Sequence, residues 1–187
     1  MAIHLRSAEE LEKMHRAGLI VYEVLTALRG IVRPGLTTMD LEKFAEEKIA
    51  GKPGKPAFKG YRGYPCTLCT SVNSEIVHGI PSPKRKLREG DIVSIDFGME
   101  VNGYFADSAV TVPVGQIAPE TAKLLEVTRE SLDRAIDKMR ACLLYTSRAA
   151  RCRCIAACPS ADFTIRLASP TPFSIWTNST FSQRVRP

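Results

Sequence analysis

Apolar residues recur near the start of the chain at the three- and four-residue steps that place side chains on one face of a helix. The stripe consists of Leu11, Met14, Gly18, Val21, Leu25 and Leu28. Ser7, followed by Glu10, matches a capping box ahead of this stripe, and the sequence RPG at 33–35 interrupts it. The pattern therefore predicts one long amphipathic helix.

The same periodicity predicts two further helices. The second begins at Thr37 or Thr38 and ends at the sequence GKPGKP (51–56), after which AFKGYRGYP continues as a loop. Its expected inner face consists of Leu41, Phe44, Ala45 and Ile49. The third helix opens at Pro119, a residue that suits the first turn. Its expected buried face consists of Leu124, Thr128, Leu132, Ala135 and Met139.

Strand-like runs lie between the second and third helices, and short turns divide them into two hairpins. The first has strands at 67–72 and 75–77 around the turn Asn73-Ser74. The second spans 91–112 and turns at Asn102-Gly103, a strong hairpin signal because both residues accept positive φ. The order of helices and hairpins predicts an α+β fold with an antiparallel sheet flanked by helices.

The second hairpin carries two aspartates among residues typical of strands. A two-residue loop sets the register, so Gly98 faces Asp107 and Asp96 faces Ala109. Because side chains alternate between faces, Asp96, Gly98 and Asp107 share one face. The two carboxylates are then diagonal neighbours, with Cβ atoms within roughly 7–8 Å.

Two carboxylates so close repel each other unless something balances their charge. A divalent cation between their oxygens would do so. A shared proton would also do so, with one pKa raised. A third interpretation is that one aspartate lies beside the turn and faces solvent. Spacing alone leaves these three alternatives open.

Composition is that of an ordinary globular domain, with 187 residues, 44% hydrophobic and 25% charged. No apolar run approaches membrane-spanning length and the N-terminus lacks a signal-peptide core, so we expect a cytoplasmic protein without a membrane partner. Residues 1–140 carry 20 basic and 19 acidic side chains, whereas 141–187 carry six arginines and one aspartate. A nucleic-acid interpretation would therefore rest on residues 141–187.

The character of the sequence changes at residue 141. Lysine is absent after Lys138 and glutamate after Glu130, and no period of 3.6 or 2 is sustained. We predict that residues 1–140 form a domain or part of one. Residues 141–187 are predicted to be a non-native, poorly folded tail such as a frameshift or translated non-coding sequence produces; CLLYTS is similar to one reading frame of a common sequencing adapter. The alternative is a genuine basic arm.

Other candidate chemistry lies upstream of the aspartates. Cys66 and Cys69 have C-x-x-C spacing without a second pair in 1–140, so we expect strand cysteines in a reducing compartment. His78 ends a predicted strand beside a glycine that permits close approach. Its imidazole could donate a hydrogen bond to a polarised carbonyl, or could simply satisfy the strand end. Tyr61, Tyr64 and Cys69 could line an apolar pocket or pack in the core.

From about residue 3 to residue 140 the sequence resembles the type I bacterial methionine aminopeptidases. The resemblance is carried by EELEKMHRAG, VRPGLTT, FKGYRGYPCTLCTSVNSEIVHGIP, LREGDIVSIDFG and NGYFADSA. Two aspartates across an Asn-Gly hairpin, downstream of N-x-x-x-x-H-G-I-P, make a specific combination. The resemblance implies the N-terminal part of a pita-bread fold, in which two pseudo-symmetric halves surround a dinuclear metal centre, in a chain that is truncated or frameshifted after residue 140.

The resemblance also implies roles for individual residues. Asp96 and Asp107 match the first two ligands of two divalent cations (Co, Mn, Fe or Zn), with Asp107 as the bridging ligand. His78 matches the catalytic histidine that contacts the substrate and stabilises the transition state. The positions that line the pocket for the methionine side chain match Tyr61, Tyr64 and Cys69, with Phe58 at a variable position.

The implied activity is metal-assisted hydrolysis that removes the N-terminal methionine from nascent proteins. The implied partners are nascent polypeptide N-termini. Ribosome association is compatible with that role, the family is expected to be monomeric, and no specific nucleic acid is expected.

The sequence departs from the family after residue 140. The family takes one histidine and two glutamates from its second half, whereas residues 141–187 contain neither residue type. We therefore expect the 187-residue chain to be inactive and poorly folded by itself. The alternatives are a non-catalytic pita-bread peptide-binding module and an Xaa-Pro peptidase relative. Retention of Asp96, Asp107 and His78 argues against the first, and GYRGYP with VHGIP favours the methionine enzyme over the second.

Overall fold

The structure is a computed structural model, and it describes residues 5–138. These residues fall into two compact units that divide between Ala118 and Pro119. The first unit holds two helices and a four-stranded sheet. The second unit is represented by one helix. The predicted tail, 141–187, lies outside the described residues, so the domain boundary at 140 stays a prediction.

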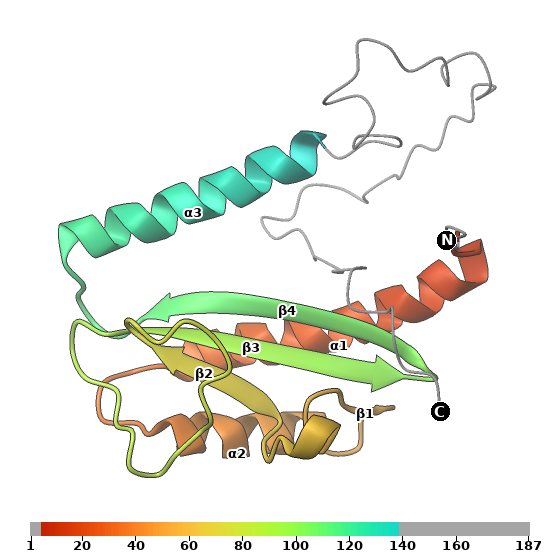
Figure 1. Cartoon of the computed structure of the whole chain (residues 1–187), viewed down its shortest axis with the longest axis horizontal. Coiled ribbons are helices and arrows are strands. Elements are labelled where there is room, and N and C mark those ends of the chain that lie inside the picture. Colours follow the sequence, from red (N-terminus) through yellow and green to blue (C-terminus); the bar gives the residue numbers. More distant parts are fainter. Residues whose placement is uncertain (1–4, 139–187) are drawn as a thin grey trace. The chain divides into compact units, whose positions relative to one another are not determined.

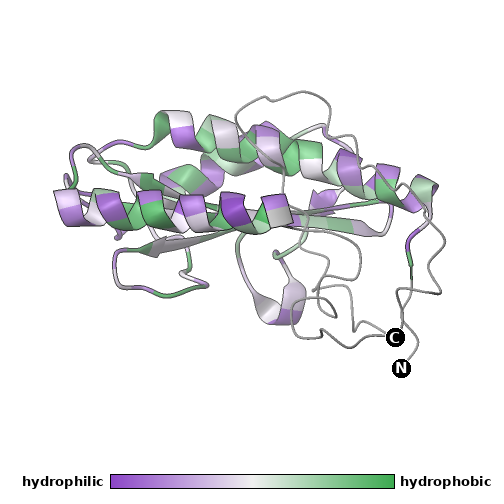
Figure 2. Cartoon of the chain, turned by 90° about the horizontal axis from the view of Figure 1, so that it is seen from above, coloured by the Kyte–Doolittle hydropathy of each residue, from purple (hydrophilic) through white to green (hydrophobic). Residues whose placement is uncertain are grey.

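Both predicted N-terminal helices form, and each begins at a capping box. Helix α1 (Ala8–Ile31) is capped by Ser7 and Glu10, and α2 (Thr38–Ile49) is capped by Thr37 together with Asp40. In each box the side chains satisfy two of the amide groups that a helix start leaves unpaired. Figure 2 shows hydrophobic and hydrophilic residues interleaved along the helices, as expected for helices with one apolar face.

The sheet is built on one long central strand. Strand β3 pairs along one edge with β4 and along the other with β1 and β2, which follow each other along that edge. All pairings are antiparallel. The strands are β1 (Lys55–Pro56), β2 (Leu68–Val72), β3 (Ile92–Val101) and β4 (Tyr104–Pro113). The short β1 lies in a segment that the sequence predicted to be loop.

The hydrophobic core lies between one face of the sheet and the two helices. Helix α1 packs on the β3–β4 hairpin, and α2 packs on β2 and on α1 (Figure 1). Ile95, Phe97 and Met99 of β3 alternate onto this face and are almost completely buried. From α1 and α2, the core includes Val21, Leu25, Leu28, Leu41 and Ala45. The predicted α+β class and antiparallel sheet are therefore confirmed.

The first predicted hairpin is wrong in its second arm, because residues 75–77 form no strand. The amide groups on the free edge of β2 are occupied by other partners. Thr70 N–H donates to the Gly79 carbonyl at 2.7 Å, and Val72 N–H donates to the Glu75 carboxylate at 2.8 Å. A side chain from the turn thus takes the place that a ladder partner would need, and β2 pairs with β3 alone.

The third predicted helix forms as α3 (Pro119–Lys138), but the expected burial of its apolar stripe is wrong. Leu124 is 59% exposed and Leu132 is 44% exposed; Thr128 and Ala135 are exposed as well. The physical reason is that this helix is the whole described part of its unit, so no other described element of that unit can cover the stripe. Met139 lies outside the described residues.

Within residues 5–138, none of the helices combines the length and the apolar content that crossing a membrane requires.

Candidate metal centre

The β3–β4 hairpin has the predicted register. Gly98 pairs with Asp107 and Asp96 pairs with Ala109. The core-facing residues of β3 occupy the opposite alternation, so both carboxylates lie on the sheet face turned away from α1. Both aspartates are half-buried. The interpretation in which one of them simply faces solvent beside the turn is therefore excluded.

Gly98 leaves space between the two aspartates, and the loop after β1 uses it. Pro56 and Leu68 are the residues of β1 and β2 nearest to this point, and Ala57 N–H donates to the Gly98 carbonyl at 2.9 Å. A Cβ atom at Gly98 would lie 2.9 Å from the Phe58 ring. The ring of Phe58 therefore packs directly over Gly98, on the face that carries the carboxylates.

The two carboxyl groups are electrostatically coupled. Burial raises the pKa of Asp96 to about 7, and the negative charge of Asp107 adds to this effect. Burial also raises the pKa of Asp107, although a hydrogen bond from Asp96 and the Ser108 backbone oppose that rise. Without a cation, burial and mutual repulsion therefore favour one proton shared by the two carboxyl groups below about pH 7.

The same pair fits a divalent cation. Oδ1 of Asp107 is buried and has no hydrogen-bond partner among the described residues. A buried carboxylate oxygen without a partner is costly, and a hard cation would satisfy it. Residues 5–138 contain no cluster of three or more histidine, cysteine or acidic side chains that could hold a metal ion. The described part of the chain thus contributes two oxygen-donor residues toward a centre.

Cys69 lies beside Asp96, and the Tyr64 side chain lies beside Cys69. Cys69 pairs with Asp96 across the β2–β3 ladder, and burial raises the pKa of its thiol, which also faces the charges of Asp96 and Asp107. The Tyr64 hydroxyl lies 2.9 Å from the Leu68 carbonyl and 3.2 Å from the Gly79 carbonyl. Burial raises the pKa of Tyr64. These two predicted pocket residues therefore form one buried polar cluster with the metal-ligand candidates.

Tyr61 and His78 are placed differently. Tyr61 is 43% exposed, and Arg62 lies over its ring. His78 is exposed and has a φ of 60°, a left-handed conformation that is uncommon for a histidine. Among the described residues, no hydrogen bond or ion pair joins His78 to the aspartates. Its neighbour Gly79 is held against β2 by hydrogen bonds to Thr70 and Ser71. The backbone next to His78 is therefore anchored, whereas the exposed imidazole forms no hydrogen bond with the described aspartates.

Cys66 and Cys69, the two cysteines of the C-x-x-C sequence, are both buried and neither forms a disulfide. Cys69 lies within β2, as predicted, and Cys66 precedes that strand.

Sequence analysis missed Glu42, which is 4% exposed. Its carboxylate accepts hydrogen bonds from Thr67 N–H at 2.5 Å and Leu68 N–H at 2.8 Å, at the start of β2. The signal that could have found it is positional. Glu42 lies one residue after Leu41 and three before Ala45, both on the inner face of α2. The helical period therefore places an acidic side chain at the edge of the buried face of this helix.

Replacing Asp96 with asparagine should stabilise the metal-free chain at high pH. The folded-state pKa of Asp96, about 7, exceeds its ordinary value of 3.8, so the folded state binds more protons between these values. Stability therefore falls as pH rises from about 4 to about 7. The asparagine side chain cannot ionise, so at pH 8 the variant should be about 1–3 kcal/mol more stable, allowing for solvent screening.

Urea unfolding of parent and Asp96→Asn at pH 4.5 and pH 8, with a chelator present, measures this difference. Asp133→Asn, in the exposed part of α3, is the matched control and should show no such pH dependence. A variant that is less stable than the parent at pH 8 would contradict the shared-proton arrangement.

Comparison with known proteins places this geometry in a family. The model of metallopeptidase family M24 matches residues 12–157. A methionine aminopeptidase of Aquifex aeolicus is 47% identical over 144 residues, covering 74% of this chain and 56% of that protein. One of Clostridium acetobutylicum is 46% identical over 136 residues, covering 73% and 54%. The chain thus spans about half the length of the curated relatives it matches.

Solved structures show the same relation. The crystal structure of a methionine aminopeptidase from Thermotoga maritima matches with a TM-score of 0.71 and 42% identity, covering 74% of this chain and 55% of that one. A prolidase from Pyrococcus horikoshii matches with a TM-score of 0.63 at 21% identity, which shows the fold alone. The expected pita-bread fold is confirmed for the part of it that this chain covers. With its family model matched over most of its length, the chain belongs to metallopeptidase family M24.

Proposed function

We propose that this chain is the N-terminal part of a methionine aminopeptidase, which removes the first residue of new proteins by hydrolysis. The observation that carries the proposal is the pair of half-buried aspartates that are diagonal neighbours on the hairpin, with an unpartnered buried oxygen on Asp107. The substrate class is supported by relatives of 46–47% identity that are named methionine aminopeptidases.

Asp96 and Asp107 would hold the divalent cations. Bound cations supply Lewis acidity, which polarises a peptide carbonyl and makes water a better nucleophile near neutral pH. Because the two carboxyl groups share a proton in the metal-free chain, that proton must leave when a cation binds. The site should therefore take up metal more readily as pH rises through the pKa of Asp96.

The other candidate residues bind and orient the substrate. In the proposed complex the His78 imidazole donates a hydrogen bond to the oxygen of the scissile carbonyl. Cys69, which adjoins Asp96, and Tyr64, which adjoins Cys69, form one wall of the pocket for the methionine side chain, and Tyr61 closes its rim. Phe58, over Gly98, extends the apolar wall of this pocket.

The 187-residue chain by itself is proposed to be inactive. The ligand set of the family includes a histidine and two glutamates beyond the segment matched here, and residues 141–187 provide neither type. The complete protein is proposed to act as a cytoplasmic monomer on nascent chains, close to the ribosome.

A chimeric enzyme tests the proposed function. Residues 1–140 would replace the aligned segment of the Clostridium acetobutylicum relative, whose remaining half restores the missing ligands. We expect the chimera to release methionine from a Met-Ala-Ser peptide in a cation-dependent reaction. His78→Ala should lower kcat at least 100-fold, because the hydrogen bond acts mainly in the transition state. Asp96→Asn and Asp107→Asn should abolish activity and metal uptake.

The controls separate the alternatives. Asp91→Asn, a conservative change outside the cluster, should leave the chimera active. The isolated 187-residue chain should release no methionine in the same assay. Cleavage of an Ala-Pro peptide in preference to Met-Ala-Ser would favour an Xaa-Pro peptidase. A folded, metal-loaded chimera that binds peptides without cleaving either of them would favour the binding module.

A further inference from the structure

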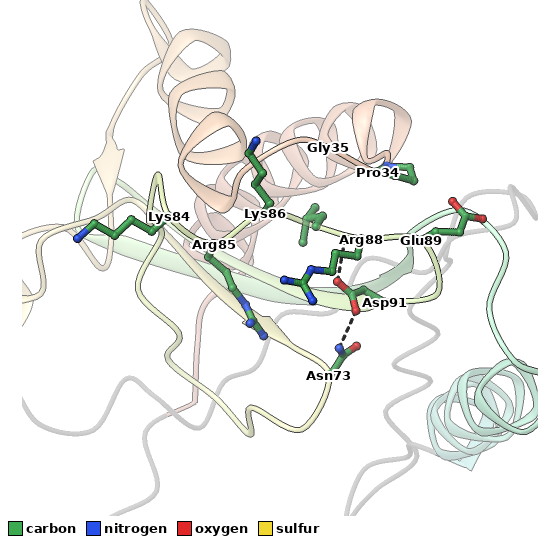
Figure 3. Close-up of a pocket in the computed structure, with 10 residues that line it drawn as sticks. Pro34, Gly35, Asn73, Lys84, Arg85, Lys86, Arg88, Glu89 and Asp91 are labelled. Carbon is green, nitrogen blue, oxygen red and sulfur yellow. Dashed lines mark hydrogen bonds between the residues drawn. The ribbon is translucent and has the colours of Figure 1, made fainter.

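A hollow among the described residues lies away from the aspartates and is lined by basic side chains. It encloses about 620 Å³, and its lining includes Lys84, Arg85, Lys86 and Arg88. These side chains come from one six-residue segment, 83–88, with the sequence PKRKLR. Figure 3 shows them fanning out from that segment, with Lys84 and Lys86 extending away from Asp91.

The basic segment is held firmly by backbone hydrogen bonds. Gly35 N–H donates to the Leu87 carbonyl at 2.8 Å, and Leu87 N–H donates to the Leu36 carbonyl at 2.8 Å. Thr38 N–H donates to the Arg85 carbonyl at 3.0 Å. Leu87 itself is buried in the core. Residues 85–88 are therefore fixed to the turn between α1 and α2, whereas Pro83 and Lys84 form a turn that is closed by a hydrogen bond from Arg85 N–H to the Ser82 carbonyl at 3.2 Å.

Most of these cations have no anionic partner. Arg85 pairs with Glu75 at 3.1 Å, but Lys84, Lys86 and Arg88 form no ion pair with any described residue. Two acids line the hollow, and both bind backbone amides. The Asp91 carboxylate accepts a hydrogen bond from Arg88 N–H at 2.8 Å, and the Glu89 carboxylate accepts one from Gln116 N–H. The hollow thus carries an excess of positive charge, four basic side chains against two carboxylates, in a chain whose first 140 residues are nearly neutral.

The chemistry of the lining selects the kind of ligand. No aromatic side chain lines the hollow, and its apolar members are Pro34 and the buried Leu87, so it lacks the aromatic anchors of protein interfaces. It also lacks the apolar side chains that a membrane-binding surface inserts. Polar, strongly positive surfaces of this kind are typical of contacts with the phosphate backbone of nucleic acids.

We propose that this hollow, formed by the segment 83–88 and the turn at Pro34-Gly35, binds the phosphodiester backbone of a single nucleic-acid strand. Lys86 and Arg88 are alternate residues of the extended part, about 6–7 Å apart, so these two cations can meet successive phosphates, and Lys84 adds a third positive charge at the preceding turn. Without aromatic platforms or base contacts, binding is independent of sequence. The proposal is separate from the peptidase function, since neither metal nor peptide takes part in it.

The test measures binding of a fluorescein-labelled oligouridylate to the full chain as a function of salt. The triple variant K84Q/K86Q/R88Q should bind at least tenfold more weakly at about 50 mM salt. Its plot of log affinity against log salt should be less steep by about 2, because three phosphate contacts are lost. The matched variant K43Q/K48Q/K123Q has the same change in net charge, but its substituted lysines are exposed elsewhere on the chain. Its affinity should stay within about twofold of that of the parent, because it removes none of the proposed phosphate contacts.

A second measurement locates the site. Oligouridylate should shift the amide NMR signals of Gly35 and of residues 84–91, and leave those of the hairpin from Asp96 to Asp107 unchanged. The three substituted side chains are exposed and take no part in the hydrogen bonds that hold the segment, so the amide spectra of variant and parent should otherwise coincide.

Three results would overturn the proposal. One is equal weakening in the two triple variants. Another is binding that persists in K84Q/K86Q/R88Q and disappears in R148Q/R151Q/R153Q, which would assign it to the tail. The third is displacement of the oligouridylate by poly-glutamate or by anionic vesicles as readily as by unlabelled strand.

Discussion

Replacing Glu42 with glutamine is expected to lower the free energy of unfolding by about 2–4 kcal/mol, a large share of the stability of a small domain. The carboxylate is buried and accepts two backbone N–H groups, from Thr67 and Leu68. Glutamine keeps the size of the side chain but offers one oxygen. Its NH2 group would face an N–H donor, so one buried amide loses its partner.

Loss of the Glu42 hydrogen bonds should also affect the cluster around Asp96. The two amides begin β2, and β2 places Cys69 beside Asp96. A frayed start of β2 should therefore loosen the cluster as well as the fold. Amide exchange at Leu68 and Cys69 should accelerate in the variant.

Urea unfolding followed by circular dichroism measures the loss for Glu42→Gln. The control is Glu46→Gln, one helical turn later in α2, whose carboxylate is half-exposed and pairs with Lys59. Exposed ion pairs contribute little, so this variant should lose less than about 1 kcal/mol. Equal losses in the two variants would show that the buried amides do not depend on Glu42.

Replacing Gly79 with alanine is expected to cost about 2–4 kcal/mol, or to detach the segment around His78. A Cβ atom there would lie 2.2 Å from the Thr70 carbonyl oxygen and 2.8 Å from its carbon. Both atoms belong to the backbone of β2, so neither can move aside without disturbing the sheet. The hydrogen bonds from Thr70 N–H and from the Tyr64 hydroxyl to the Gly79 carbonyl would be lost together.

Two measurements separate global from local damage. Urea unfolding reports the global loss, and amide exchange at Thr70 reports release of the segment alone. Gly30→Ala is the control, since no atom lies within 4 Å of its added Cβ and the residue is in α1. That change should stabilise the chain by up to about 1 kcal/mol. Unchanged stability and unchanged protection at Thr70 in Gly79→Ala would contradict the close packing.

The contacts of Gly79 also explain why the sequence could identify His78 as a candidate residue but could not predict its position in the structure. The sequence shows a histidine before a glycine, and the resemblance suggests its role. The structure adds that Gly79 is fixed to β2 by hydrogen bonds, while the His78 ring extends into solvent at a φ of 60°. In the chimera, Gly79→Ala should therefore impair catalysis through His78 without removing any group that touches substrate.

Local physics determined much of the fold in advance. The capping box at Ser7 gave the start of α1, and the 3.6-residue period gave most of the apolar stripes of α1 and α2, although Leu11 of the predicted stripe is exposed; these features depend on neighbours within a few residues. The Asn102-Gly103 turn determined the register of β3 and β4, and with it the diagonal positions of Asp96 and Asp107 on one face. A two-residue loop leaves little freedom, so the proximity of the two aspartates followed from spacing.

Only the tertiary structure decided where distant segments meet. Whether residues 75–77 would pair with β2 depended on Glu75 and Gly79 reaching its edge first. The role of Glu42 depended on α2 packing against the start of β2, across more than twenty residues of sequence. The positive charge of residues 83–88 did not stand out in the sequence, because residues 1–140 as a whole are nearly neutral. These residues line a hollow only because their backbone pairs with the turn between α1 and α2. Short-range patterns specify conformation, whereas contacts between remote residues are selected by packing and by the competition of buried polar groups for partners.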